Sequence, residues 1–178
     1  MTVIIRYEGV IAAQQITFLK NRTRPASVSM HDLEALQMMH DAGHNVHVIY
    51  DKNLTEDNDS NLAKIISIIG PDRVHDFYNH AVTWTPEHVR RGNHVLYELC
   101  LIMGDEFNDK LIFVGSTAMD AMAYRSLHGF TNKENIKYGK FIASGDATLR
   151  ARRNADTVIW AKSGEGVLCE IEMMVNQK

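Results

Sequence analysis

The chain has 178 residues, of which 45% are hydrophobic and 23% are charged, a composition typical of a globular protein with a sizeable core. A formal net charge of −3 gives no global attraction to nucleic acid or to an anionic membrane, and no apolar run approaches the roughly 20 residues of a membrane span. The two cysteines, Cys100 and Cys169, lie in apolar helix-like segments, as free thiols do in a reducing compartment. We therefore expect a cytoplasmic protein.

Strand and helix patterns alternate along the chain, which indicates an α/β fold with a parallel sheet covered by helices on both faces. The apolar run Val3–Ile5, followed by a stop at Gly9, predicts the first buried strand. Two β-prone segments come next, Gln14–Leu19 and Ala26–Met30, with a basic turn between them. They predict a β-hairpin inserted after the first strand, at about residues 14–30.

The rest of the chain predicts five further strands and six helices in one domain that spans residues 1–178. The strands are expected at Asn45–Tyr50, Val74–Tyr78, Leu111–Val114, Lys140–Ala143 and Thr157–Trp160. The helices are expected at Met30–Ala42, from the end of the polar loop Asp51–Ser60 through Ile69, and at Pro86–Met103, Ala118–Ser126, Asp146–Asn154 and within Gly164–Val175. The acidic loop before Ser60 lacks the central glycine of a calcium loop and is interpreted as a solvated cap of the next helix.

Four stretches carry a recognisable order of motifs. The first strand runs into Arg6-Tyr7-Glu8-Gly9-Val10, and Val28–Asp32 leads into the first helix. The strand Leu111–Val114 ends in Gly115 and is followed by Ser116, Thr117 and Asp120. Near the end, Arg153-Asn154-Ala155-Asp156-Thr157-Val158 is followed by Ser163-Gly164-Glu165-Gly166-Val167 and by Glu170-Ile171.

In order and spacing these stretches resemble the haloacid dehalogenase (HAD)-like superfamily. The resemblance is to 3-deoxy-D-manno-octulosonate 8-phosphate phosphatases and to the C-terminal domain of acylneuraminate cytidylyltransferases, and it spans nearly the whole chain. It implies a Rossmann-like HAD fold with a parallel sheet between helices, no large cap, and the hairpin insert after the first strand.

The sequence departs from this family at the positions that carry its chemistry. The family's reaction needs an aspartate nucleophile, a second aspartate as acid/base and acidic ligands for magnesium, and these positions read Arg6, Glu8 and Ser116. Tyr50 replaces the phosphate-binding threonine, and Asn93 replaces the lysine that neutralises the phosphoryl oxygens. Because a guanidinium can neither attack phosphorus nor bind a metal ion, the resemblance implies a pseudoenzyme without an intact catalytic site.

The remaining motif positions include Thr117 and the acidic residues Glu8 and Asp120. One interpretation places the Arg6 charge where the metal ion would lie, paired with Glu8, Asp51 or Asp120. The other places Arg6 at the edge of the sheet with its charge in solvent. Neither the histidines nor the cysteines are spaced as metal ligands, so no metal site is expected.

A cationic pocket would hold a small anionic ligand, and the candidates for this contact are Arg6, Lys52 and Arg91. No glycine-rich phosphate loop accompanies them. The ligand-binding candidates therefore comprise Arg6, Glu8, Asp51, Lys52, Arg91 and Asp120.

The leading functional hypothesis is a catalytically degenerate HAD-like protein that acts through binding or oligomeric assembly. In the family that it resembles, the hairpin insert builds a homotetramer, so a homo-oligomer, with a tetramer favoured, is expected here. One alternative is an active phosphatase or hydrolase of sugar phosphates or nucleotides that uses Glu8, Asp51 or Asp120 with Mg²⁺. Another is an accessory subunit of a different enzyme.

Overall fold

The computed structural model describes residues 1–12, 28–77, 94–103, 110–130, 139–144, 146–162 and 164–176. These ranges form a six-stranded sheet in the order β3-β2-β1-β4-β5-β6, in which all neighbouring strands are parallel. The strands are β1 (Thr2–Arg6), β2 (Asn45–Tyr50), β3 (Val74–Asp76), β4 (Leu111–Gly115), β5 (Lys140–Ser144) and β6 (Thr157–Ile159). The helices are α1 (Met30–Asp41), α2 (Ser60–Ile69), α5 (His94–Met103), α6 (Ala118–Phe130), α7 (Leu149–Arg153) and α8 (Val167–Asn176), with a 3-10 turn η1 (Pro71–Arg73).

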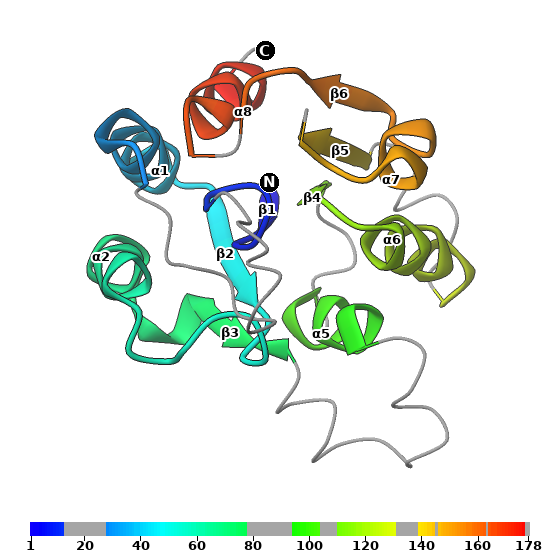
Figure 1. Ribbon diagram of the computed structural model, residues 1–178, viewed down its shortest axis with the longest axis horizontal. Coiled ribbons are helices and arrows are strands. Elements are labelled where there is room, and N and C mark those ends of the chain that lie inside the picture. Colours follow the sequence, from blue (N-terminus) through cyan, green and yellow to red (C-terminus); the bar gives the residue numbers. More distant parts are fainter. Residues whose placement is uncertain are drawn as a thin grey trace, which may run out of the picture.

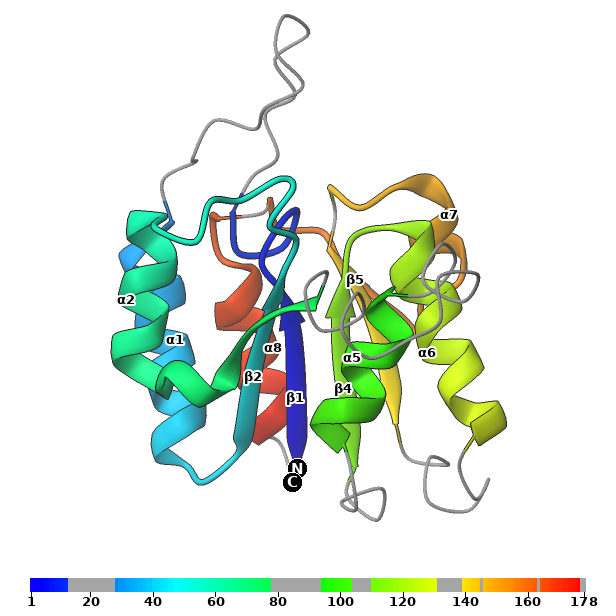
Figure 2. The same cartoon turned by 90° about the horizontal axis from the view of Figure 1, so that it is seen from below.

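Two layers of helices enclose the sheet. Figures 1 and 2 show α1, α2 and α8 on one side of it and α5, α6 and α7 on the other. Because successive strand residues face opposite sides, Val3 and Ile5 pack with the first layer and Ile4 packs with the second. The predicted α/β, Rossmann-like architecture is confirmed, and no helix of the described ranges is long and apolar enough to cross a membrane.

The predicted elements are found with shifted ends. The first strand extends one residue further than the apolar run, so Arg6 is the last residue of β1. The helix predicted over Asp146–Asn154 is shorter, because the Thr148 side chain accepts from the Ala151 N–H and caps α7 one residue before Leu149. The acidic loop behaves as predicted: Asp59 caps α2 by accepting the N–H groups of its first turn.

Several predictions concern residues outside the described ranges. Most of the predicted hairpin at 14–30 lies there, as does the first half of the helix predicted from Pro86. The end of the second hairpin segment is described, and its last residue, Met30, belongs to α1 instead, after an N-cap at Ser29. The described ranges contain no cap domain over the sheet.

A buried carboxylate joins the first helix to the last. Asp32 in α1 is completely buried, and its two oxygens accept from the N–H groups of Gly166, at 3.0 Å, and Leu168, at 3.1 Å. These N–H groups belong to the start of α8, where helix backbone donors lack partners within the helix. Asp32 therefore fixes α8 against α1 on the same face of the sheet.

Candidate functional site

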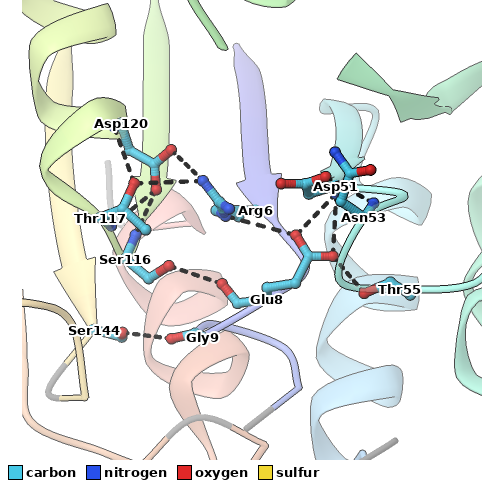
Figure 3. Close-up of polar contacts among 10 residues, drawn as sticks. All are labelled: Arg6, Glu8, Gly9, Asp51, Asn53, Thr55, Ser116, Thr117, Asp120 and Ser144. Atoms are coloured by element: carbon cyan, nitrogen blue, oxygen red, sulfur yellow. Dashed lines mark hydrogen bonds and ion pairs between the residues drawn. The ribbon is translucent and has the colours of Figure 1, made fainter. Parts of the chain in front are cut away.

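Polar side chains gather at the carboxyl edge of the sheet, where the parallel strands end. Arg6 is the last residue of β1, Thr55 lies in the loop after β2, Asp120 is in the first turn of α6 after β4, and Ser144 ends β5. Figure 3 shows these groups around the turn that follows β1. Ligands of open α/β sheets bind at this edge, so we take it as the candidate functional site.

Arg6 lies inside the protein, with 4% of the residue's surface exposed. Its Nη1 atom donates to Asp120 Oδ1 at 2.7 Å and lies 3.4 Å from Thr117 Oγ1. Its Nε atom is 3.6 Å from Glu8 Oε1, which is an ion pair without a hydrogen bond (Figure 3). The predicted pairing of Arg6 is therefore confirmed for two of its three candidate partners, Glu8 and Asp120, and the interpretation that placed its charge in solvent is wrong. The placement of this charge at the position of a metal ion stays a prediction.

Asp120 is fully buried and uses both carboxylate oxygens. Oδ1 accepts from Arg6, and Oδ2 accepts from the backbone N–H groups of Ser116, at 2.9 Å, and Thr117, at 3.0 Å. The Thr117 hydroxyl in turn accepts from the Asp120 N–H at 3.2 Å. A carboxylate in the first turn of a helix is also favoured by the helix dipole, so α6 holds this charge in one position.

Glu8 is 2% exposed and fastens the loop after β2 to the end of β1. Its oxygens accept from the Asp51 N–H, at 3.0 and 3.2 Å, and from the Thr55 hydroxyl at 2.6 Å. Burial raises the pKa of Glu8 to about 7, against the opposing effects of the Arg6 charge and the Thr55 hydrogen bond. Near neutral pH this carboxyl group is therefore poised between its two protonation states.

The charge of Arg6 is fixed. Burial alone would lower its pKa, but the negative charges of Asp120 and Glu8 outweigh burial and raise it. The two partners contribute unequally, because Asp120 forms a direct hydrogen bond and Glu8 is almost 1 Å further away. We therefore regard Arg6–Asp120 as the principal ion pair and Glu8 as the weaker neighbour whose own charge depends on pH.

Two serines hold the backbone between these groups. The Ser116 hydroxyl donates to the Glu8 carbonyl at 2.8 Å, and the Ser144 hydroxyl donates to the Gly9 carbonyl at 2.7 Å. Gly9 has a φ of +77°, and a Cβ atom there would lie 2.7 Å from the Cβ of Ser116. The turn after β1 thus requires glycine and is bound to the ends of both β4 and β5.

Of the residues that the sequence proposed, the structure brings together Arg6, Glu8, Ser116, Thr117 and Asp120. Tyr50 points elsewhere: its hydroxyl donates to Asp57 Oδ1 at 2.7 Å, and its ring packs with the core under α1 and α2. Asp51 contributes its backbone N–H to Glu8, while its carboxylate accepts from the Asn53 N–H; Lys52 is exposed. Arg91 and Asn93 lie outside the described residues.

Sequence reasoning missed three residues of the site: Thr55, Ser144 and Phe77. Phe77 is 3% exposed, and its ring centroid lies 5.3 Å from Cζ of Arg6, within the range of a cation–π contact. Phe77 follows the short strand β3 directly, and this position is a weak indication in the sequence that it lies at the same edge of the sheet. No motif or spacing in the sequence distinguishes Thr55 and Ser144 from the other small polar residues near them.

The residues present do not fit a magnesium ion. Magnesium requires a near-octahedral shell of oxygen ligands, and the lone pairs of Glu8 and Asp120 are already directed to Arg6, to backbone N–H groups and to Thr55. A guanidinium group donates to the carboxylate that would have to bind the ion. Across the described ranges no group of three or more His, Cys, Asp or Glu side chains could hold a metal ion.

The cysteines show no sign of nucleophilic activation. Cys169 Sγ lies 3.4 Å from the His31 carbonyl and 3.7 Å from Asp32 Oδ1. Burial, followed by the negative charge of Asp32, raises the pKa of this thiol, and burial raises the pKa of Cys100. Both thiols are free and disfavour the thiolate form that nucleophilic catalysis needs.

Comparison with solved structures finds the same fold in HAD phosphatases. The cobalt-bound deoxy-D-mannose-octulosonate 8-phosphate phosphatase of Haemophilus influenzae superposes with a TM-score of 0.62 at 17% identity, over 98% of this chain and 85% of that one. The Moraxella catarrhalis 3-deoxy-D-manno-octulosonate 8-phosphate phosphatase, solved with magnesium, phosphate and the sugar acid, gives 0.62 at 12% identity, over 98% and 84%. The Yersinia pestis phosphatase of the same name gives 0.61 at 13% identity, over 98% and 79%.

At these identities the likeness establishes the fold, which is HAD-like, and not the activity. The sequence itself matches no family model and no curated protein.

Proposed function

We propose that this chain is a catalytically degenerate HAD-like protein that acts through binding or assembly. The observation that carries the proposal is the buried Arg6–Asp120 ion pair at the end of β1. The resemblance implies that the phosphatases carry their nucleophilic aspartate at the end of the first strand. Of the similar structures, the Haemophilus influenzae phosphatase contains cobalt and the Moraxella catarrhalis phosphatase contains magnesium and phosphate. In this chain the end of β1 carries Arg6, whose positive charge is already paired with Asp120, and this supports the proposal.

The same pairing weakens the interpretation of Arg6 as an anion-binding group. Its Nη1 donates to Asp120, and Glu8 lies 3.6 Å from its Nε, so an incoming anion would meet a carboxylate on either side. The cluster formed by Arg6, Glu8 and Asp120 has no net positive charge while Asp120 is ionised. A small anionic ligand would therefore depend on other cations, for which Lys52 and Arg91 remain the candidates.

The experiment that tests degeneracy compares the native chain with Arg6→Asp, which returns an acidic residue to the end of β1. We expect the native protein to release no phosphate from sugar phosphates, nucleotides or an aryl phosphate, with or without Mg²⁺, and to show no Mg²⁺-dependent rise in melting temperature. We expect Arg6→Asp to be less stable without metal, because Asp, Glu8 and Asp120 then repel one another, and to be stabilised by Mg²⁺. Arg125→Asp makes the same charge change at an exposed position of α6 and serves as the control.

One observation favours the alternative of an active hydrolase: the pKa of Glu8, raised to about 7, suits a general acid or base. Magnesium-dependent phosphate release by the native chain that disappears in Glu8→Gln would support this alternative and would contradict the degenerate interpretation. The result does not depend on whether Arg6→Asp folds, since the native protein and Glu8→Gln decide it.

Assembly is the second part of the proposal. By resemblance, the predicted hairpin at about residues 14–30 supports a homo-oligomer, with a tetramer favoured, and the free cysteines suit a cytoplasmic location. Light scattering coupled to size exclusion at micromolar concentration measures the mass directly, and a monomer would contradict the proposal. If the native chain is monomeric and inactive, the remaining hypothesis is that of an accessory subunit of another enzyme.

A further inference from the structure

Large apolar side chains on the outside of the protein gather on two helical surfaces. Seven of the described residues are large, hydrophobic and exposed. Three of these lie on α1 and α8, which cover one side of the sheet, and four lie on α6, on α7 and directly after β6. The first group is Met30, Met38 and Met173, and the second is Met119, Met122, Leu149 and Trp160. Exposed apolar side chains that gather on one surface are typical of an interaction site.

The outer surface of α1 and α8 carries carboxylates between its methionines, and we call it the acidic face. It is defined by Glu34, Met38 and Asp41 on α1 and by Glu170 and Met173 on α8, all of which are exposed. Successive members on each helix are three or four residues apart, so they follow one another along one side of that helix. Neither helix contains a lysine or an arginine. The acidic face therefore offers apolar contacts between negative charges.

The outer surface of α6 and α7 has the same construction with the opposite charge, and we call it the basic face. It is defined by Met119, Met122 and Arg125 on α6 and by Leu149, Arg150 and Arg153 on α7, all of which are exposed. The members on α6 are again three residues apart. The two helices contain four arginines, and their one acidic residue, Asp120, is buried. The basic face therefore offers apolar contacts beside positive charges.

Trp160 adds an aromatic ring to the edge of the basic face. It is 70% exposed, and Cζ of Arg152 on α7 lies 5.6 Å from its ring centroid, within the range of a cation–π contact. This contact holds the indole against α7. Tryptophan and arginine are enriched among the side chains that contribute most to the free energy of protein–protein binding. A tryptophan that is both held by an arginine and open to solvent is therefore suited to pack against a partner.

The described contacts of these charges leave them accessible to a partner. Glu34 Oε2 lies 3.7 Å from Nδ1 of His31, and Asp41 Oδ1 accepts from Gln37 Nε2 at 2.8 Å, both at the surface of α1. Exposed contacts of this kind contribute little and are readily exchanged for others. Beside α7, the carboxylate of Asp156 is engaged with the sheet, where its Oδ2 accepts a backbone N–H of β5 at 2.8 Å. Both faces can therefore form ion pairs with a partner.

We propose that the acidic face of one copy of this chain binds the basic face of a second copy in a head-to-tail contact. The inference rests on the homo-oligomer proposed above and names the surfaces that form it. The two faces belong to the two helical layers on opposite sides of the sheet (Figures 1 and 2), so a copy that binds one neighbour through the acidic face keeps its basic face available for the next. Head-to-tail contacts close into a ring or continue as a filament, and a ring of four would be the favoured tetramer.

Charge and apolar surface together identify the partner as a second copy. A nucleic acid or an anionic membrane would meet the basic face alone and would leave the methionines of the acidic face in solvent. A second copy covers both faces at once and brings carboxylates to arginines. Because exposed ion pairs add little to affinity, the methionines, Leu149 and Trp160 supply most of it, and the charges fix which face meets which.

Charge reversal on one face at a time tests this contact in the full chain. Glu34→Lys with Glu170→Lys reverses the acidic face, and Arg150→Glu with Arg153→Glu reverses the basic face. Either variant alone would bring like charges together, so we expect the dissociation constant for its self-association, measured by sedimentation at about 0.15 M salt, to rise at least about tenfold. An equimolar mixture of the two variants pairs opposite charges at every alternating contact, and we expect it to regain the native mass.

The controls reverse a charge outside both faces. Lys64→Glu on α2 and Asp72→Lys in η1 are exposed positions and should leave the native mass unchanged. An unchanged oligomer in both reversed variants, or a mixture that does not reassemble, would overturn the two faces while leaving a homo-oligomer built by another surface. A monomeric native chain would overturn the homo-oligomer as well. If a reversed variant does not fold, self-association of the native chain must weaken as salt rises from about 0.05 to about 0.5 M, and a mass independent of salt would overturn the proposal.

Discussion

The cation of Arg6, which keeps its charge at every accessible pH, has two carboxylate neighbours that are held in different ways. Asp120, in the first turn of α6, accepts a hydrogen bond from Arg6 at 2.7 Å, whereas Glu8 lies 3.6 Å from the guanidinium and accepts hydrogen bonds from the loop after β2. Burial raises the pKa of Glu8 to about 7, so the charge of Glu8 depends on pH near neutrality. The comparison shows that a buried charge in one fold can be permanent or conditional, and that partner and distance decide which.

The largest expected effect tests the permanent charge. Asp120→Ala removes the main partner of Arg6 and the acceptor of two backbone N–H groups, so we expect a loss of about 3–5 kcal/mol in the free energy of unfolding, as for other broken buried ion pairs. Urea denaturation at pH 7 measures it. The exposed Asp72→Ala should lie within about 0.5 kcal/mol of the native chain. A loss below 1 kcal/mol for Asp120→Ala would show that Arg6 finds other partners.

The second prediction concerns Glu8 and its pH dependence. Because the folded state raises the pKa of Glu8 from 4.5 to about 7, the folded chain binds more protons in this window, and the Glu8 contribution to stability is lost as pH rises from 4.5 through 7. Glu8→Gln should remove that loss. Between pH 4.5 and 7, the free energy of unfolding of Glu8→Gln should rise relative to that of the native chain by up to about 1.4 kcal/mol per pH unit. Parallel curves between pH 4.5 and 7 would contradict the raised pKa.

For His47 we expect stability to depend on pH in the opposite direction, over a pH range that overlaps that of Glu8. Its pKa is lowered from 6.5 to about 4, so the unfolded chain binds the extra proton and stability falls as pH drops from 6.5 toward 4. His47→Gln should flatten this fall by up to about 1.4 kcal/mol per pH unit, measured by the same denaturation series. In the native chain the slopes of Glu8 and His47 oppose each other between pH 4.5 and 6.5, and only the two variants separate them.

The smallest expected effect concerns the loop after β2. Thr55→Val deletes the hydroxyl that donates to Glu8 at 2.6 Å and leaves the volume nearly unchanged, so we expect a loss of about 1–2 kcal/mol at pH 8, where Glu8 is ionised. At pH 5, where Glu8 is protonated, the loss should be smaller. Thr117→Val would not serve as a control because Thr117 also contacts Arg6; the exposed Ser67→Ala does. Equal losses for Thr55→Val at both pH values would indicate that the charge of Glu8 does not matter to this contact.

The sequence predicted the fold well because each buried strand is a short apolar run between polar stops. The runs at Val3–Ile5, Asn45–Tyr50 and Leu111–Val114 all became central strands, with ends shifted by one residue at most. Motif order then brought Arg6, Glu8 and Asp120 to one edge, since the carboxyl ends of parallel strands meet there. The local hydrophobic pattern and the sheet topology were therefore sufficient to predict the central strands and the edge at which these three residues meet.

Side-chain pairings across the fold were harder to predict. The contacts of His47 with His75 and of His75 with Glu98 require the exact register of β2 on β3 and the orientation of α5. In the sequence they appear only as single polar residues, His47 and Glu98, within apolar segments. Tyr50 was placed at the site by motif position, but its side chain alternates to the other face of the sheet. A polar residue inside an apolar run signals a buried contact without identifying its partner.

The carboxylate of Asp32 has a consequence for how the chain is made. Its two N–H partners follow 134 and 136 positions later, and α1 packs along α8. During synthesis on the ribosome, α1 emerges early with a carboxylate and an apolar face whose partner helix has not yet been translated. The strands β1 and β2 can pair at once, but the surface of α1 that packs against α8 stays exposed to solvent until α8 leaves the ribosomal exit tunnel. Nascent chains released before residue 167 should therefore expose that side to chaperones, whereas chains extended past α8 should not.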